Sequence, residues 1–133
     1  MQETDLVYPL PGCDRGLGQV IQSADSADLI DEVRIQPLVL WPDDRGYFLE
    51  AFRLGRNLTA AFPPDTTQIS VACNYPGAIK AFHYHLRQSD CFSPAAGLFQ
   101  IALVDLRRGS RTFARRNTIY AGLLRSWIVL SPP

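Results

Sequence analysis

From residue 32 onward, apolar and polar side chains alternate in short runs rich in β-branched and aromatic residues. Alternation of this kind is typical of β-strands that bury one face. The runs predicted to be strands are 33–40, 46–52, 68–74, 79–85, 97–106 and 127–130. Clusters of Pro, Gly, Asp and Ser between them predict turns. The pattern therefore predicts an all-β domain, either a sandwich or a barrel.

Residues 1–31 lack this alternation. Pro and Gly interrupt the first part, and Ser23–Asp28 is polar, so we expect an irregular N-terminal arm with one helical turn near Ala24–Ile30. A short helix is also expected at Leu54–Phe62. We divide the chain into this arm, 1–31, and a β-barrel domain, 32–133. Because the chain stops directly behind its last predicted strand, the barrel is expected to be incomplete at its C-terminus.

Composition narrows the function classes. A length of 133 residues fits one domain, and 13 basic residues balance 13 acidic ones. The absence of a basic excess argues against a general nucleic-acid binder. No signal-peptide pattern opens the chain, and no apolar run is long enough to span a bilayer. The three cysteines show no CxxC spacing and are expected to be reduced. These features predict a cytoplasmic protein without a membrane partner.

The two histidines of the chain, His83 and His85, lie in the predicted strand 79–85. Alternate residues of a strand share a face, so both imidazoles are expected on one face. Such a pair can hold a metal ion, can work as a base and its orienting partner, or can be an exposed polar face. With Gly77, Asp90 and Gly97, the spacing resembles the first cupin motif, with Asp in place of Glu. This resemblance implies an alternative in which His83, His85 and Asp90 bind a divalent transition metal.

Four segments resemble a more specific family, the dTDP-4-dehydrorhamnose 3,5-epimerases, which are cupin-fold enzymes of sugar nucleotides. Asp44–Glu50 resembles D-x-R-G-x-F-x-E, and Gln68–Ser70 resembles Q-x-N. Ala78–His85 resembles V-L-R-G-L-H-x-Q, and Val104–Phe113 resembles V-D-L-R-x-G-S-P-T-F. The resemblance runs from about residue 32 to residue 133. It implies a cupin-like double-stranded β-helix, which is a jelly-roll barrel.

The resemblance also implies a function. The chain is expected to be an epimerase or isomerase of a dTDP-sugar that uses no cofactor and forms a homodimer by exchanging the N-terminal arm. A base removes the proton next to a ketone, an enolate forms, and a proton returns on the other face. By resemblance, His83 is the base. The residues that the resemblance assigns to substrate binding are Arg45 for the diphosphate, Phe48 for sugar or base packing, Glu50, Gln68 and Lys80.

Lys80 stands where the family has Arg, and the chain departs from the family pattern at three further positions. Asp90 stands where the family has a lysine that stabilises the enolate oxygen, Ile101 where it has an acidic residue, and His85 where it has Gln. A carboxylate at position 90 would repel an enolate. These departures favour the alternatives, namely a metal-dependent cupin enzyme for another small polar substrate, or a non-catalytic sugar- or metal-binding cupin. Asp105 and Arg107 are predicted to be a structural pair at a strand end.

Overall fold

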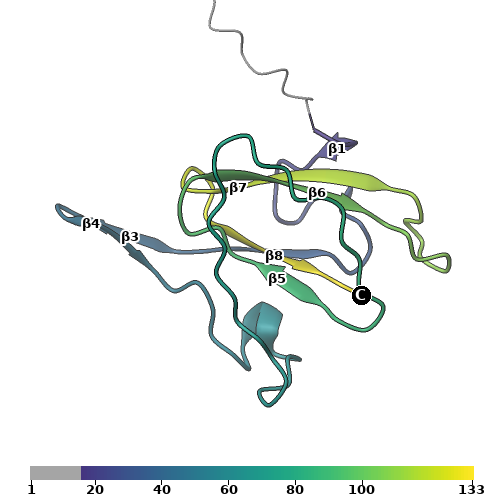
Figure 1. Ribbon diagram of the computed structural model, residues 1–133, viewed down its shortest axis with the longest axis horizontal. Helices are drawn as coiled ribbons and strands as arrows, with labels where there is room; N and C mark the ends of the chain where they lie inside the picture. Colours follow the sequence, from purple (N-terminus) through teal and green to yellow (C-terminus); the bar gives the residue numbers. More distant parts are fainter. Residues whose placement is uncertain (1–15) are drawn as a thin grey trace, which may run out of the picture.

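The computed structural model describes residues 16–133 of the chain, which contain two three-stranded β-sheets lying one above the other (Figure 1). The upper sheet in Figure 1 contains, in spatial order, β1 (Gln19–Val20), β7 (Arg116–Gly122) and β6 (Leu98–Val104). The lower sheet contains β2 (Arg34–Pro37), β8 (Trp127–Ser131) and β5 (Asp90–Phe92). A separate antiparallel hairpin contains β3 (Leu40–Asp43) and β4 (Gly46–Leu49). The helical element of the described range is the 3-10 helix η1 (Asn57–Thr59).

The core lies between the two sheets and is built mainly by β7 and β8. Ile119 and Ala121 of β7 are fully buried, and they belong to one apolar cluster with Trp127 and Val129 of β8. These residues alternate along their strands, so their side chains point to the same face and can pack against the other sheet. The described part of the predicted arm, residues 16–31, adds Ile21 and Ile30 to the cluster.

Two buried polar side chains of β7 attach this part of the arm to the upper sheet. The Asn117 side-chain carbonyl accepts a hydrogen bond from the Ile30 backbone N–H at 2.8 Å. The Thr118 hydroxyl oxygen accepts one from the Leu17 backbone N–H at 2.6 Å. Both side chains are fully buried, so these bonds satisfy groups that would otherwise destabilise the fold. The segment from Gly16 to Asp31 is therefore irregular, as predicted, but it lies firmly on β7.

Several sequence predictions are confirmed. The all-β class is correct, and strands occupy most of the predicted runs 33–40, 46–52, 97–106 and 127–130. Four strands were not predicted, namely β1, β5, the central strand β7 and β3, of which only Leu40 lies in a predicted run. The alternation that would reveal β7 is hidden, because Asn117 and Thr118 are polar in sequence but buried by their contacts with the arm. A closed barrel stays a prediction, because the sheets keep open edges in this structure.

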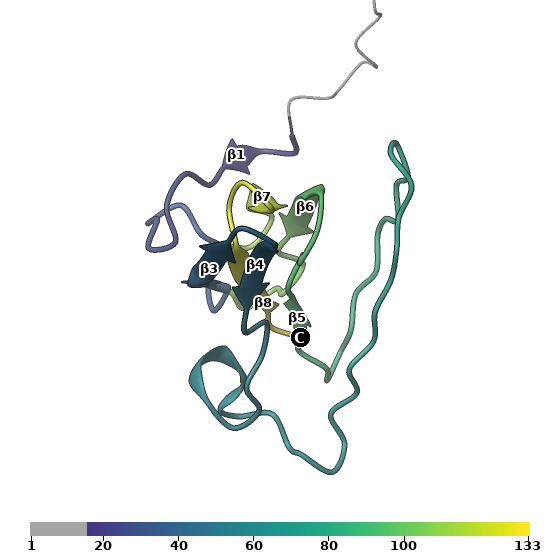
Figure 2. The same cartoon turned by 90° about the vertical axis from the view of Figure 1, so that its left-hand side faces the viewer.

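Two predicted strands, 68–74 and 79–85, are wrong. The stretch 66–88 contains no strand and runs out from η1 and back to β5, apart from both sheets (Figure 2). A strand depends on hydrogen bonds to a neighbouring strand, and no sheet edge lies beside this stretch. The predicted helical turn at Ala24–Ile30 is also wrong, since that stretch consists of turns and bends. The predicted helix at Leu54–Phe62 is reduced to η1.

None of the helical structure within residues 16–133 has the length and apolar character that crossing a membrane requires.

Candidate functional site

Arg45 and Phe48 lie on the β3–β4 hairpin, which projects away from the sheets (Figure 1). Arg45 occupies the turn, where its guanidinium Nη2 lies 2.7 Å from the Asp43 carboxylate. This hydrogen bond holds the pKa of Asp43 below its ordinary value. Phe48 is exposed and lies directly opposite Trp41 in the register of the hairpin, so their side chains share one face. The hairpin tip is an open concavity, lined by Asp43, Arg45, Gly46, Tyr47 and Phe48.

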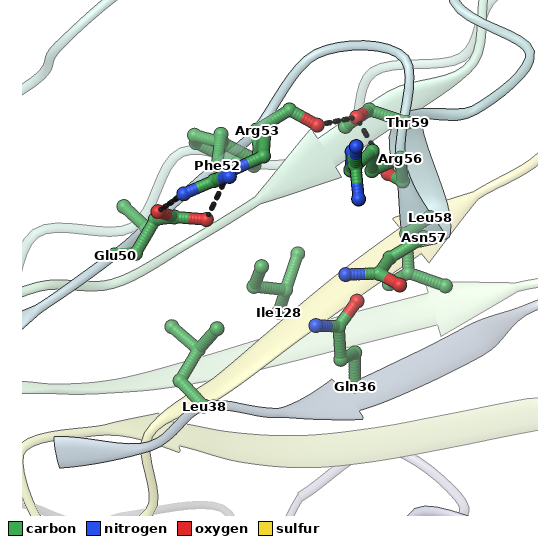
Figure 3. Close-up of a pocket in the computed structure, with 11 residues that line it drawn as sticks. Gln36, Leu38, Glu50, Phe52, Arg53, Arg56, Asn57, Leu58, Thr59 and Ile128 are labelled. Carbon is green, nitrogen blue, oxygen red and sulfur yellow. Dashed lines mark hydrogen bonds and ion pairs between the residues drawn. The ribbon is translucent and has the colours of Figure 1, made fainter.

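Glu50 follows the hairpin and lies at a second hollow, shown in Figure 3. Its two carboxylate oxygens accept hydrogen bonds from Arg53, from Nε at 2.9 Å and from Nη2 at 2.5 Å. This bidentate pair holds the pKa of Glu50 below its ordinary value. Leu38 and Ile128 form the apolar side of the hollow, and Arg56 lies near η1. Arg53 was not among the predicted site residues, although an acid followed three positions later by an arginine was a usable signal.

The remaining epimerase candidates lie on the separate stretch 66–88. Gln68 donates a hydrogen bond from its side-chain amide to the Ser70 hydroxyl at 3.0 Å. Lys80 and His83 are exposed, and within residues 16–133 their side chains form no hydrogen bond or ion pair. Both ribbon views show this stretch apart from the β3–β4 hairpin (Figures 1 and 2). The structure therefore does not bring His83 into one pocket with Arg45.

His85 differs from His83 because it has a carboxylate neighbour. Its Nε2 atom lies 3.3 Å from the Oδ2 atom of Asp90, the first residue of β5. The other carboxylate oxygen of Asp90 accepts a hydrogen bond from the Gln88 side-chain amide at 2.7 Å. His83 does not join this pair, and nowhere in the described range do three His, Cys, Asp or Glu side chains form a group able to hold a metal ion. Two of the three residues of the metal alternative are thus in contact.

Asp105 lies at the end of β6, where its carboxylate is completely buried. It accepts hydrogen bonds from the Arg107 guanidinium at 3.0 Å, the Ser110 hydroxyl at 2.6 Å and the Thr112 hydroxyl at 2.7 Å. Burial raises the pKa of Asp105, but these hydrogen bonds lower it more, so the group is held ionised. Arg107 also pairs with Glu32. The predicted structural pair is confirmed, and it fastens the loop after β6 to the chain before β2.

Comparisons with known proteins place these residues in context. The family model described as dTDP-4-dehydrorhamnose 3,5-epimerase matches residues 27–121. The spore coat polysaccharide biosynthesis protein SpsL of Bacillus subtilis (strain 168) is 38% identical over 104 residues, which are 78% of this chain and 66% of that protein. The matched region thus spans slightly less than two thirds of that relative. No solved structure matches the chain.

Proposed function

Because this chain belongs to the dTDP-4-dehydrorhamnose 3,5-epimerase family, we propose that it removes and returns the proton next to the keto group of a dTDP-sugar. The observation that carries the proposal is the extent of the family match, residues 27–121, which includes both the β3–β4 hairpin and the histidine pair. The name of the relative SpsL also supports a sugar-nucleotide substrate, because biosynthesis of a coat polysaccharide consumes activated sugars.

The proposed reaction needs a base, stabilisation of the enolate oxygen, and binding of the nucleotide. In this proposal, His83 removes the proton, because an imidazole is the side chain most often used for such a step. Arg45 binds the diphosphate, since its planar guanidinium presents paired donors to phosphate oxygens. The remaining substrate contacts come from Phe48, Glu50, Gln68 and Lys80. The reaction as proposed uses no cofactor.

The proposal requires the stretch 66–88 to dock against the rest of the molecule. It carries His83, and it also exposes several large apolar side chains: Ile69, Val71, Tyr75, Ile79, Phe82, Tyr84 and Leu86. Most of its backbone N–H and C=O groups have no backbone partner within the described residues. Exposed apolar side chains and unpaired backbone groups are both stabilised by docking. Docking would bring His83 towards the substrate residues of the hairpin.

A homodimer is part of the same proposal. On the hairpin, Trp41 and Phe48 are exposed and lie opposite each other on one face of a two-stranded ribbon, and Val39, just before β3, is exposed as well. A contiguous apolar face of this kind is a common feature of protein interfaces. A second copy of the chain that covered it would bury these side chains. Size-exclusion chromatography with light scattering tests this point, and a monomer at micromolar concentration would contradict it.

The experiment for the proposed activity measures proton exchange with solvent. The full chain is incubated in D2O with a dTDP-4-keto sugar, and deuterium at C3 and C5 is followed by NMR. The wild type is expected to exchange at least one of these protons, and His83→Gln is expected to lose exchange at the carbon from which His83 removes the proton. Arg87→Ala, a change in the same stretch at a residue without a proposed role, is the control and should exchange like the wild type. A wild type that exchanges neither proton contradicts the proposal.

A further inference from the structure

Two of the positions that depart from the family pattern contact each other in the structure. The resemblance places Gln at position 85 and Lys at position 90, where this chain has His85 and Asp90. His85 Nε2 and Asp90 Oδ2 are 3.3 Å apart. Taken singly, a carboxylate in place of a lysine removes a positive charge from the site. Taken together, the two replacements create an imidazole–carboxylate pair at positions where the family pattern has Gln and Lys.

The carboxylate of this pair is held in place from two directions. The backbone of Asp90 is fixed because β5 pairs with β8, with Asp90 opposite Ser131. Its Oδ1 atom accepts the hydrogen bond from Gln88, which leaves Oδ2 to face the imidazole. The Asp90 side chain is 29% exposed, and the His85 side chain is 41% exposed. The carboxylate is thus the more enclosed partner, while part of the imidazole remains open to an incoming ligand.

A carboxylate beside one ring nitrogen of histidine determines what the other nitrogen can do. With Oδ2 of Asp90 3.3 Å from Nε2, a hydrogen bond donated by Nε2–H to this carboxylate would favour the neutral imidazole with its proton on Nε2 and would leave Nδ1 as a proton acceptor. A base with its own orienting group is the arrangement used in many enzymes, and such contacts are often long before the substrate is bound. His83 has no carboxylate partner among residues 16–133.

We infer that His85, oriented by Asp90, is a second base of the proposed reaction. This inference rests on the proposed function. A 4-keto sugar has two acidic C–H bonds, at C3 and C5, and His85 Nδ1 accepts the proton from one of them. The C–H electron pair forms the C=C bond of the enolate, and the carbonyl π electrons move to the oxygen. The proton on Nδ1 is then exchanged with solvent, and a proton from solvent is added to the enolate carbon, so the imidazole–carboxylate pair ends unchanged. His85 is the catalytic residue, and Asp90 is its positioning residue.

The test follows exchange at C3 and C5 separately in His85→Gln, in Asp90→Asn and in the double variant. Each single change is expected to lower kcat for exchange at one carbon by about 100-fold or more, with KM nearly unchanged. Asparagine keeps the shape of aspartate but does not hold the same tautomer. The double variant is expected to be no slower than the slower single variant, because the two residues act as one unit. Arg87→Ala again serves as the control for folding and for exchange.

A second measurement does not depend on activity. The 15N chemical shifts of the imidazoles report which ring nitrogen carries the proton. The wild type is expected to show the Nε2–H form of His85, and Asp90→Asn is expected to change the His85 shifts while those of His83 stay constant. Unchanged His85 shifts would overturn the positioning role of Asp90.

The outcomes separate the two proposals. Suppose that the wild type exchanges and that His83→Gln abolishes exchange, but that His85→Gln exchanges the protons at both C3 and C5 at the wild-type rate. The role of His85 as a second base is then wrong, and the proposed function stands. If the double variant lost the combined kcat of both single variants, His85 and Asp90 would act independently, and their action as one unit would be wrong. If the wild type exchanges neither carbon, the proposed function fails and the role of His85 as a base fails with it.

Discussion

Replacing Asp105 with alanine should destabilise the fold more than any other single carboxylate change in residues 16–133. Its buried carboxylate accepts three hydrogen bonds from Arg107, donated by the backbone N–H, Nε and Nη2. It accepts two more from the hydroxyls of Ser110 and Thr112. Removing one partner of a buried charge pair costs about 3–5 kcal/mol. Arg107 would keep Glu32 as a partner, and its side chain is 27% exposed, so the lower end applies. We expect Asp105→Ala to lower the free energy of unfolding by about 3 kcal/mol.

Urea unfolding followed by tryptophan fluorescence measures this loss. Trp127 is buried in the core and reports the transition. The matched control is Asp43→Ala, which removes an aspartate–arginine pair of similar length whose side chains are 47% and 85% exposed. Exposed pairs contribute about 0–1 kcal/mol, so the control should unfold almost like the wild type. A loss below about 1 kcal/mol for Asp105→Ala, or an equal loss for both variants, would refute the reasoning.

Three further predictions follow from burial and backbone geometry. Because its hydrogen bonds lower the pKa of Asp105 more than burial raises it, its stabilisation is complete above the ordinary carboxyl pKa of about 3.9 and is lost as the pH falls below that value. The free energy of unfolding should therefore drop below about pH 4 in the wild type by more than in Asp105→Ala, as measured by urea titrations at each pH. Gly122→Ala should cost at least about 2 kcal/mol, because Gly122 has a φ of 140° and an added Cβ would lie 2.2 Å from a backbone oxygen of Gly97. Gly109→Ala, where an added Cβ meets nothing within 4 Å, should leave the urea midpoint unchanged, and equal midpoints for the two variants would contradict the argument. Burial raises the pKa of Cys91 to about 11, so with the other two cysteines replaced by serine its thiol should react slowly with a disulfide reagent at pH 8, and much faster in urea. Equal rates with and without urea would show that the Cys91 thiol is accessible in the folded protein.

Local sequence patterns were sufficient for several elements. The alternation at 97–106 and 127–130 predicts β6 and β8, because a strand between two layers needs an apolar residue at every second position. The Asp105–Arg107 pair was likewise predictable, since two residues at this separation can reach one another across a strand end. The family pattern could also be read directly from the residues, and the match over 27–121 confirms it.

Contacts between distant parts of the chain decided the rest. Asn117 and Thr118 appear polar in sequence, yet both are buried in the central strand, because the arm supplies partners 87 and 101 positions away. The runs 68–74 and 79–85 have the alternation of strands but form none here, since a strand needs a neighbour that its own residues do not specify.

The histidine pair shows the same division. The sequence determined that His83 and His85 carry the imidazoles and that Asp90 follows them. The folded arrangement was needed to show that His85, and not His83, lies against Asp90. The order of residues states which side chains are present. Which of them meet depends on the position of β5, which is fixed by its pairing with β8. The free energy of that pairing comes from contacts throughout the sheet and not from the site residues themselves.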